Sequence, residues 1–227
     1  MAPAPTVLAT AKAVVFDAYG TLFDVHSVVA RHAAAIGTSA QPFSDLWRQK
    51  QLEYSWVLSL AGRYEPFWIL TERALDYAFT RFPEVDRGLR PALLQAYRKL
   101  DAYGDASSTL GALRRGGLRT GILSNGDPGM LDAAVTSADL GKDLDAVLSV
   151  DAAAVFKTHP RAYELALSAF SAGTDDIVFV SSNRWDIAGA TAFGFRTVWI
   201  NRAGLPEEYA ELAPRAVVSS LRELLAD

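Results

Sequence analysis

The sequence predicts an α/β protein, a Rossmann-like parallel sheet with an inserted helical cap. Three observations lead to this prediction. Short apolar runs with β-branched residues recur along the chain, as in the buried strands of a parallel sheet. From residue 107 onward these runs alternate with segments of helical periodicity. Between residues 25 and 101, helical periodicity continues without a good strand, which indicates a separate helical unit.

The first expected strand is Ala13–Phe16, and an acidic residue follows it directly. The segment AVVFDAYGTLFD places Asp17 at the end of the strand, with Gly20 and Thr21 in the turn that follows. In open α/β sheets, ligands bind at the carboxyl edge of the strands. We therefore interpret Asp17 as a site residue rather than as a side chain that only caps the turn.

The helical unit is expected to contain three helices. Ser44 is a candidate cap for a first helix that ends at residues 61–62, and Pro66 opens a second helix that ends at Pro83. A third helix is expected near residues 89–100.

This pattern divides the chain into two expected domains. Residues 1–24 and 102–227 form the core, and residues 25–101 form a cap over the carboxyl edge of the sheet. Most aromatic side chains of the cap are expected to be core, and a minority to line a pocket.

The second half of the core is expected to alternate regularly between helix and strand. The expected elements are helix 108–116, strand 118–123, helix 128–138, strand 144–150, helix 160–170, strand 177–180, helix 185–193, strand 197–200, strand 216–218 and helix 221–225.

Composition narrows the class of protein. The net charge of −4 argues against a nucleic-acid partner, and the absence of cysteine excludes disulfides and thiolate metal sites. The three histidines lack metal-ligand spacing, and no apolar run reaches the roughly 18 residues of a membrane span. Residues 1–12 do not resemble a signal peptide. We expect them to form a frayed tail on a soluble, cytoplasmic protein.

Polar residues follow four segments of the predicted sheet. They are Asp17, the pair Ser124-Asn125, Lys157, and the run Ser181–Asn183 with Asp186. Each has an ordinary structural explanation: a turn for Ser124, a solvated surface for Lys157, a helix N-cap for the last run. All four in this order on one α/β chain favour a common site at the carboxyl edge.

The segment FDAYGTLFD resembles the first motif of the haloacid dehalogenase superfamily, in which the Asp is a nucleophile. Superfamily phosphatases carry a second acid two residues later, where this chain has Tyr19. They also carry magnesium-binding acids where this chain has Ser182 and Asn183, and only Asp186 is acidic. The resemblance therefore implies the L-2-haloacid dehalogenase branch, with no metal and no cofactor.

Two further segments resemble this branch. WRQKQLEYSW is similar to a cap-helix stretch whose Arg, here Arg48, reaches the leaving halide; the alternative is a surface Arg paired with Glu53. FKTHPRAYELA resembles the Lys segment, with Lys157 and Tyr163, although many relatives have Pro-Asp where this chain has Thr158-His159.

The resemblance implies a role for each site residue. Asp17 would attack C2 of a short (S)-2-haloacid with inversion, and water would then release an (R)-2-hydroxy acid. Lys157 would keep Asp17 ionised and stabilise the oxyanion, while Asp186 would either anchor Lys157 or help to activate water. Ser124 and backbone N–H groups would bind the substrate carboxylate. Thr21, Ser181 and Asn183 would orient Asp17 and water; Tyr19, Gln49, Leu52, Phe67, Asn125 and Trp185 would line the pocket.

The expected partners are the haloalkanoate, water, the halide product and a second copy of the chain, since the family often forms homodimers. Haloacetates, including fluoroacetate, are further candidate substrates. Three other functions compete with this hypothesis. They are a phosphatase of the same superfamily, a phospho-acceptor signalling domain, and a binding protein with a relic site.

Overall fold

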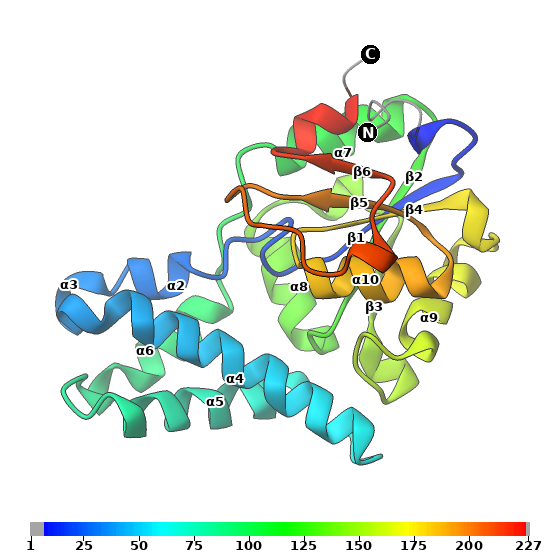
Figure 1. The fold of residues 1–227 in the computed structure, drawn as a ribbon. Helices are drawn as coiled ribbons and strands as arrows, with labels where there is room; N and C mark the ends of the chain where they lie inside the picture. The colour runs from blue at the N-terminus through cyan, green and yellow to red at the C-terminus, as the bar shows by residue number, and fades with distance from the viewer. Residues whose placement is uncertain (1–6, 226–227) are drawn as a thin grey trace.

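The computed structural model, which describes residues 7–225, contains a six-stranded, fully parallel sheet (Figure 1). The strand order is β3-β2-β1-β4-β5-β6. β1 therefore lies inside the sheet, paired with β2 and β4. The predicted fold class is confirmed. The strands are β1 (Ala13–Phe16), β2 (Arg119–Ser124), β3 (Ala146–Ser149), β4 (Ile177–Ser181), β5 (Arg196–Ile200) and β6 (Ala216–Val218).

Helices join the parallel strands and cover the sheet. They are α7 (Ala106–Arg115), α8 (Pro128–Ser137), α9 (Pro160–Phe170) and α10 (Arg184–Phe193). α9 and α10 pack against each other below the sheet in Figure 1, and α7 packs on the opposite side against the C-terminal turn. β1 is completely buried, as expected for a strand covered on both faces.

A helical lobe, residues 27–97, lies beside the sheet (Figure 1). Its helices are α2 (Ser27–Ala30), α3 (Ala33–Ile36), α4 (Ala40–Leu60), α5 (Phe67–Arg81) and α6 (Arg90–Tyr97). α4 and α5 run side by side and bury facing apolar stripes, including Phe43 and Trp47 on α4 and Leu70 and Ala74 on α5. No strand is assigned between Ser27 and Tyr97, as the helical periodicity predicts.

Three local predictions need correction. Ser44 does not cap α4, which begins four residues earlier, after a turn at Gly37 with positive φ; Ser44 Oγ instead contacts Nδ1 of His26 at 3.1 Å. The last helix is a 3₁₀ turn, Leu221–Leu225. Three elements, Ala13–Phe16, Pro160–Phe170 and Ala216–Val218, have the predicted bounds.

The expected frayed tail is wrong for residues 7–12, whereas residues 1–6 lie outside the described part. Val7 is buried, and its carbonyl accepts a hydrogen bond from Arg196 at 3.0 Å. The Lys12 N–H donates to the carbonyl of Asp176 at 2.8 Å, next to the start of β4. Over residues 7–225, no helix has both the length and the apolar run that crossing a membrane requires.

Candidate active site

Asp17 lies directly after β1 and is almost completely buried. Its Oδ1 accepts a bond from Lys157 Nζ at 3.0 Å. Its Oδ2 accepts a bond from Asn183 Nδ2 at 2.8 Å and longer bonds from the hydroxyls of Thr21 (3.3 Å) and Ser181 (3.4 Å). One carboxylate oxygen is thus fixed by three neutral donors and the other faces an ammonium group, so the orientation of Asp17 is set before any substrate binds.

The turn after Asp17 brings Thr21 to the end of β4. Gly20 has a φ of +91°, a conformation that favours glycine, and a Cβ there would lie 3.0 Å from the Ser182 hydroxyl. Thr21 Oγ1 accepts the N–H of Ser182 at 2.8 Å. The Gly-Thr pair therefore closes the turn tightly against the run Ser181–Asn183 after β4.

Lys157 is fully buried between two carboxylates. Its Nζ lies 3.0 Å from Asp17 Oδ1 and 2.8 Å from Asp186 Oδ2, and its N–H donates to Asn125 Oδ1 at 2.9 Å. Burial lowers the pKa of Lys157, but the charges of Asp17 and Asp186 and their hydrogen bonds raise it further than burial lowers it. Lys157 is therefore an ammonium ion throughout the physiological pH range.

Both carboxylate oxygens of Asp186 are occupied. Oδ2 accepts from Lys157, and Oδ1 accepts from the hydroxyl of Tyr163 at 2.8 Å. Burial, followed by the charge of Asp17, raises the pKa of Asp186 to about 6, although Lys157 opposes this shift. Asp186 is thus held behind Lys157, away from Asp17.

The end of β2 supplies the neighbouring wall. Ser124 Oγ accepts the N–H of Gly126 at 3.1 Å, and Asn125 Nδ2 is buried without a partner among the described residues. Gly126 leaves space for the Tyr19 ring, because a Cβ there would lie 2.7 Å from Cε2 of Tyr19. The Tyr19 hydroxyl is also buried without a partner within residues 7–225, and burial raises its pKa well above the usual value. Two polar groups of this wall are thus available to a ligand.

These elements enclose a small pocket beneath the helical lobe. Asp17, Ser124 and Asn125 form its floor, and the lobe covers it with Arg48 and Leu52 from α4 and with Phe67 from α5. Its lining residues are Asp17, Tyr19, Arg48, Leu52, Phe67, Ser124, Asn125 and Trp185. A carboxylate and a guanidinium thus face one enclosed space, which suits the displacement of an anionic leaving group.

Comparison with known proteins agrees with this geometry. A family model described as haloacid dehalogenase-like hydrolase matches residues 11–194. The chain belongs to this family.

Its similarity to individual members of the family extends over almost the whole chain. "(S)-2-haloacid dehalogenase 1" of Pseudomonas sp. (strain CBS-3) is 50% identical, over 94% of each chain. A crystal structure of a dehalogenase superposes with a TM-score of 0.92 at 46% identity, over 94% of this chain and 95% of that chain. The L-2-haloacid dehalogenase of Xanthobacter autotrophicus with chloropropionic acid covalently bound has a TM-score of 0.83 at 39% identity, over 94% and 96%.

In this haloacid dehalogenase-like hydrolase, most residues that the sequence singles out do come together. Thr21, Lys157, Ser181 and Asn183 contact Asp17, whereas Tyr163 reaches only Asp186. Among residues 7–225, no group of three His, Asp or Glu side chains is arranged to hold a metal ion.

Two predictions on α4 need comment. Gln49 is exposed and does not line the pocket, because it lies on the opposite side of the helix from Trp47 and Gln51. The alternative pairing of Arg48 with Glu53 is wrong as well, since Glu53 binds Lys50 at 2.7 Å.

The sequence reasoning missed a buried polar chain in the lobe of this hydrolase. Gln51 Nε2 donates to Thr71 Oγ1 at 2.9 Å, and Gln51 Oε1 accepts from the hydroxyl of Tyr97 at 3.3 Å. Tyr97 shares a small cavity with Arg48. Burial raises the pKa of Tyr97, and the charge of Arg48 partly opposes this shift. The signal was present: Phe43, Trp47, Gln51 and Ser55 recur every four residues on one face of α4.

Proposed function

We propose that this protein is a metal-independent hydrolase of carbon–halide bonds that converts short (S)-2-haloacids into (R)-2-hydroxy acids. One observation carries the proposal: Asp17, in a buried ion pair with Lys157, lines a small pocket that Arg48 also lines. The names of the similar proteins support the same reaction.

In the first step, Asp17 attacks C2 from the side opposite the halogen. Oδ1 has a single donor whereas Oδ2 has three, so Oδ1 is the freer nucleophile. A bond forms between Oδ1 and C2, and the halide leaves with the electron pair of the carbon–halogen bond. Arg48 faces the same pocket and would receive the halide. The product is an ester of Asp17 with inverted configuration at C2.

In the second step, water attacks the carboxyl carbon of Asp17. The negative charge develops on Oδ2, the carbonyl oxygen of the ester, to which Thr21, Ser181 and Asn183 donate. Lys157 Nζ, 3.0 Å from Oδ1, stabilises Oδ1 as it leaves with the hydroxy acid. The ester C–O bond on the enzyme side breaks, the hydroxy acid leaves, and one proton is released overall. Because Asp186 is fully buried, binds Lys157 and Tyr163, and does not line the reaction pocket, we assign Asp186 to anchoring Lys157 rather than to activating water.

The remaining pocket residues would orient the substrate. Ser124, with backbone N–H groups at the end of β2, binds its carboxylate, and Tyr19, Leu52, Phe67 and Trp185 surround its carbon chain. In this assignment residues 1–24 and 102–227 form the catalytic core, and residues 25–101 form the cap that excludes water. We also propose that the protein is cytoplasmic and that it forms a homodimer. Sedimentation of the purified protein tests whether it is a dimer.

Halide release from (S)-2-chloropropionate in the presence of EDTA tests the reaction. Wild type is expected to release chloride and D-lactate, and Asp17→Asn to lose at least roughly 10⁴-fold in rate. Asp132→Asn, on the exposed side of α8, is the matched control and keeps wild-type activity. Haloacetates, including fluoroacetate, form the second substrate series. Magnesium-dependent phosphate-ester hydrolysis without halide release would contradict the proposal.

A further inference from the structure

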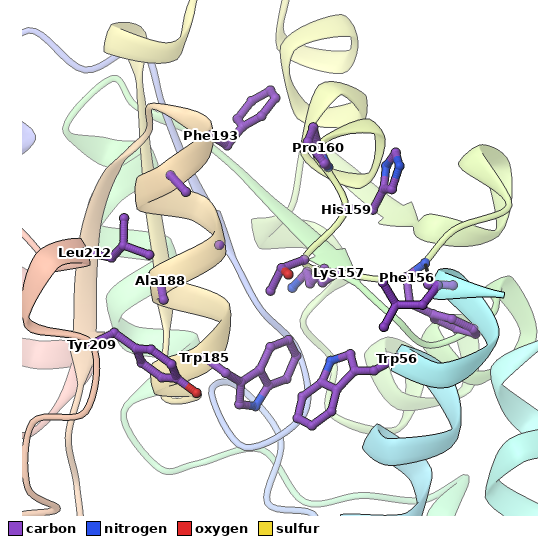
Figure 2. Close-up of a pocket in the computed structure, with 15 residues that line it drawn as sticks. Trp56, Phe156, Lys157, His159, Pro160, Trp185, Ala188, Phe193, Tyr209 and Leu212 are labelled. Atoms are coloured by element: carbon purple, nitrogen blue, oxygen red, sulfur yellow. Dashed lines mark hydrogen bonds between the residues drawn. The ribbon is translucent and has the colours of Figure 1, made fainter. Parts of the chain in front are cut away.

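A second, larger pocket lies next to the reaction pocket, between α4 of the lobe and α10 of the core (Figure 2). Its volume is about 610 Å³, within the range of roughly 300–1,000 Å³ that is typical of small-molecule sites. The walls are mainly apolar. They include Trp56 and Leu60 from α4, Phe156 from the loop before α9, and Trp185 and Phe193 from α10. Neither the proposed chemistry nor the substrate contacts above use this space.

The two pockets share one wall. Trp185 lines both of them, and Lys157 lines the larger pocket while binding Asp17. Figure 2 shows the indole of Trp185 facing that of Trp56 across the gap between α10 and α4. Their ring centroids are 5.5 Å apart with the planes at 79°, an edge-to-face contact. This indole pair forms a partition beside the reaction pocket.

Three hydrogen bonds fasten the lobe to the core. Tyr64 OH donates to Asp151 Oδ1 at 2.8 Å, the Phe156 N–H donates to Ser59 Oγ at 3.0 Å, and the Trp68 N–H donates to Asp127 Oδ2 at 3.1 Å. These bonds hold the lobe to the segments that follow β2 and β3. Toward α10 the lobe presents the Trp56 ring, which is 37% exposed. Moving the Trp56 ring would break none of these three hydrogen bonds.

We infer that the larger pocket is an alkyl-chain site for 2-haloalkanoates longer than propionate, and that Trp56 is the residue that limits chain length. The inference rests on the proposed function. Asp17, Arg48 and Ser124 fix the C2 carbon, the halogen and the carboxylate in the small pocket, so a longer chain on C2 must leave past Trp185. Beyond Trp185 lies apolar space of sufficient volume, and a chain that passes Trp185 would meet Trp56, which packs against it there.

The test compares kcat/KM for (S)-2-bromopropionate and (S)-2-bromohexanoate in wild type, Trp56→Ala and Val57→Ala. Val57 neighbours Trp56 on α4, is exposed, and does not line the larger pocket. Wild type is expected to prefer bromopropionate. In Trp56→Ala the ratio shifts toward bromohexanoate by at least tenfold, since each methylene that becomes buried can contribute up to roughly fourfold, equivalent to about 0.8 kcal/mol. Val57→Ala keeps the wild-type ratio.

A ratio in Trp56→Ala within about twofold of wild type would overturn the inference, as would an equal shift in Val57→Ala. Trp56→Leu provides the same comparison if the alanine variant does not fold. Failure of wild type to release bromide from bromopropionate refutes the proposed function itself, so the two failures are distinguishable.

Discussion

The edge of the sheet and the helical lobe contribute to the site in different ways. At the sheet edge, Asp17, Lys157 and Asp186 are buried and joined by contacts of 2.8–3.0 Å. In the lobe, Arg48 is only partly buried on a helix whose polar side chains bond mainly within the lobe. In the proposed function, the core fixes the nucleophile, and the lobe supplies the enclosure, the halide contact and the limits on substrate shape. Changes in the core should stop the reaction, and changes in the lobe should alter which substrate is used.

Lys157→Met should have the largest effect. It leaves the buried carboxylates of Asp17 and Asp186 without their shared counter-ion, which should lower the free energy of unfolding by about 3–5 kcal/mol. Loss of the ammonium group that stabilises Oδ1 as it leaves should lower kcat by at least roughly 10²–10³-fold. Urea unfolding and halide release measure the two effects.

The double variant Lys157→Met/Asp186→Asn separates structure from chemistry. Removing one of the two stranded charges should restore part of the stability but none of the activity. If activity returned with stability, Lys157 would act only as a structural counter-ion.

Arg48→Lys should come next, and should depend on the leaving group. A lysine keeps the charge but loses the planar set of donors, so kcat should fall by about 10²-fold with (S)-2-chloropropionate. The fall should be smaller with (S)-2-bromopropionate, because bromide needs less stabilisation as it leaves. Arg63→Lys, at an exposed position just after α4, is the control. Equal losses with both substrates would argue against a contact with the halide.

Activity should also depend on the protonation of Asp186. As pH falls through about 6, Asp186 takes up a proton, its hold on Lys157 weakens, and kcat/KM should decline. Tyr163→Phe removes a hydrogen bond that lowers the pKa of Asp186, so the acid limb should move to higher pH by up to about one unit.

The free energy of unfolding should depend on the protonation of Asp186 in the opposite direction from activity. Because the folded-state pKa of about 6 lies above that of an unfolded Asp, the contribution of this group to stability is lost as pH rises through 6 and regained in acid. The acid limb therefore does not arise from unfolding through this group. If the acid limb of kcat/KM, followed from pH 5 to 8, were unchanged in Tyr163→Phe, Asp186 would not be the group that titrates in that limb.

The smallest effects are expected from a matched pair on α4. Gln51→Ala removes the acceptor of the buried Tyr97 hydroxyl and should cost about 1–3 kcal/mol of stability. The Thr71 hydroxyl loses one donor but still donates to the carbonyl of Phe67 at 2.9 Å. Gln49→Ala, on the exposed side, should stay within about 0.5 kcal/mol of wild type. Thermal unfolding of both variants distinguishes the two positions, and equal losses would contradict the helix orientation.

Much of the core site could be predicted because parallel strands fix where their ends meet. Asp17, Ser124 and Ser181 each lie at the carboxyl end of a strand, so their proximity follows from the sheet alone. Lys157 lies eight residues after the end of β3, and no spacing rule says where a segment of that length places its side chains. Its position in the site was predicted from the resemblance to the family.

The buried side of each lobe helix was harder to predict, because it depends on which elements pack against that helix. A shift of two residues along α4 separates the exposed Gln49 from the buried Gln51, and α5 decides which of them is buried. The start of α4 likewise depends on the turn at Gly37 and on packing, rather than on the capping preference of Ser44.

A single turnover in water labelled with heavy oxygen tests the central claim, that Asp17 forms an ester with the substrate. With enzyme in excess over (S)-2-chloropropionate, the label should enter the carboxylate of Asp17 and be absent from the first molecule of hydroxy acid, as mass spectrometry of the peptide and of the product would show. Label that appears directly in the hydroxy acid, with none in Asp17, would mean that water attacks the substrate itself and would contradict this account.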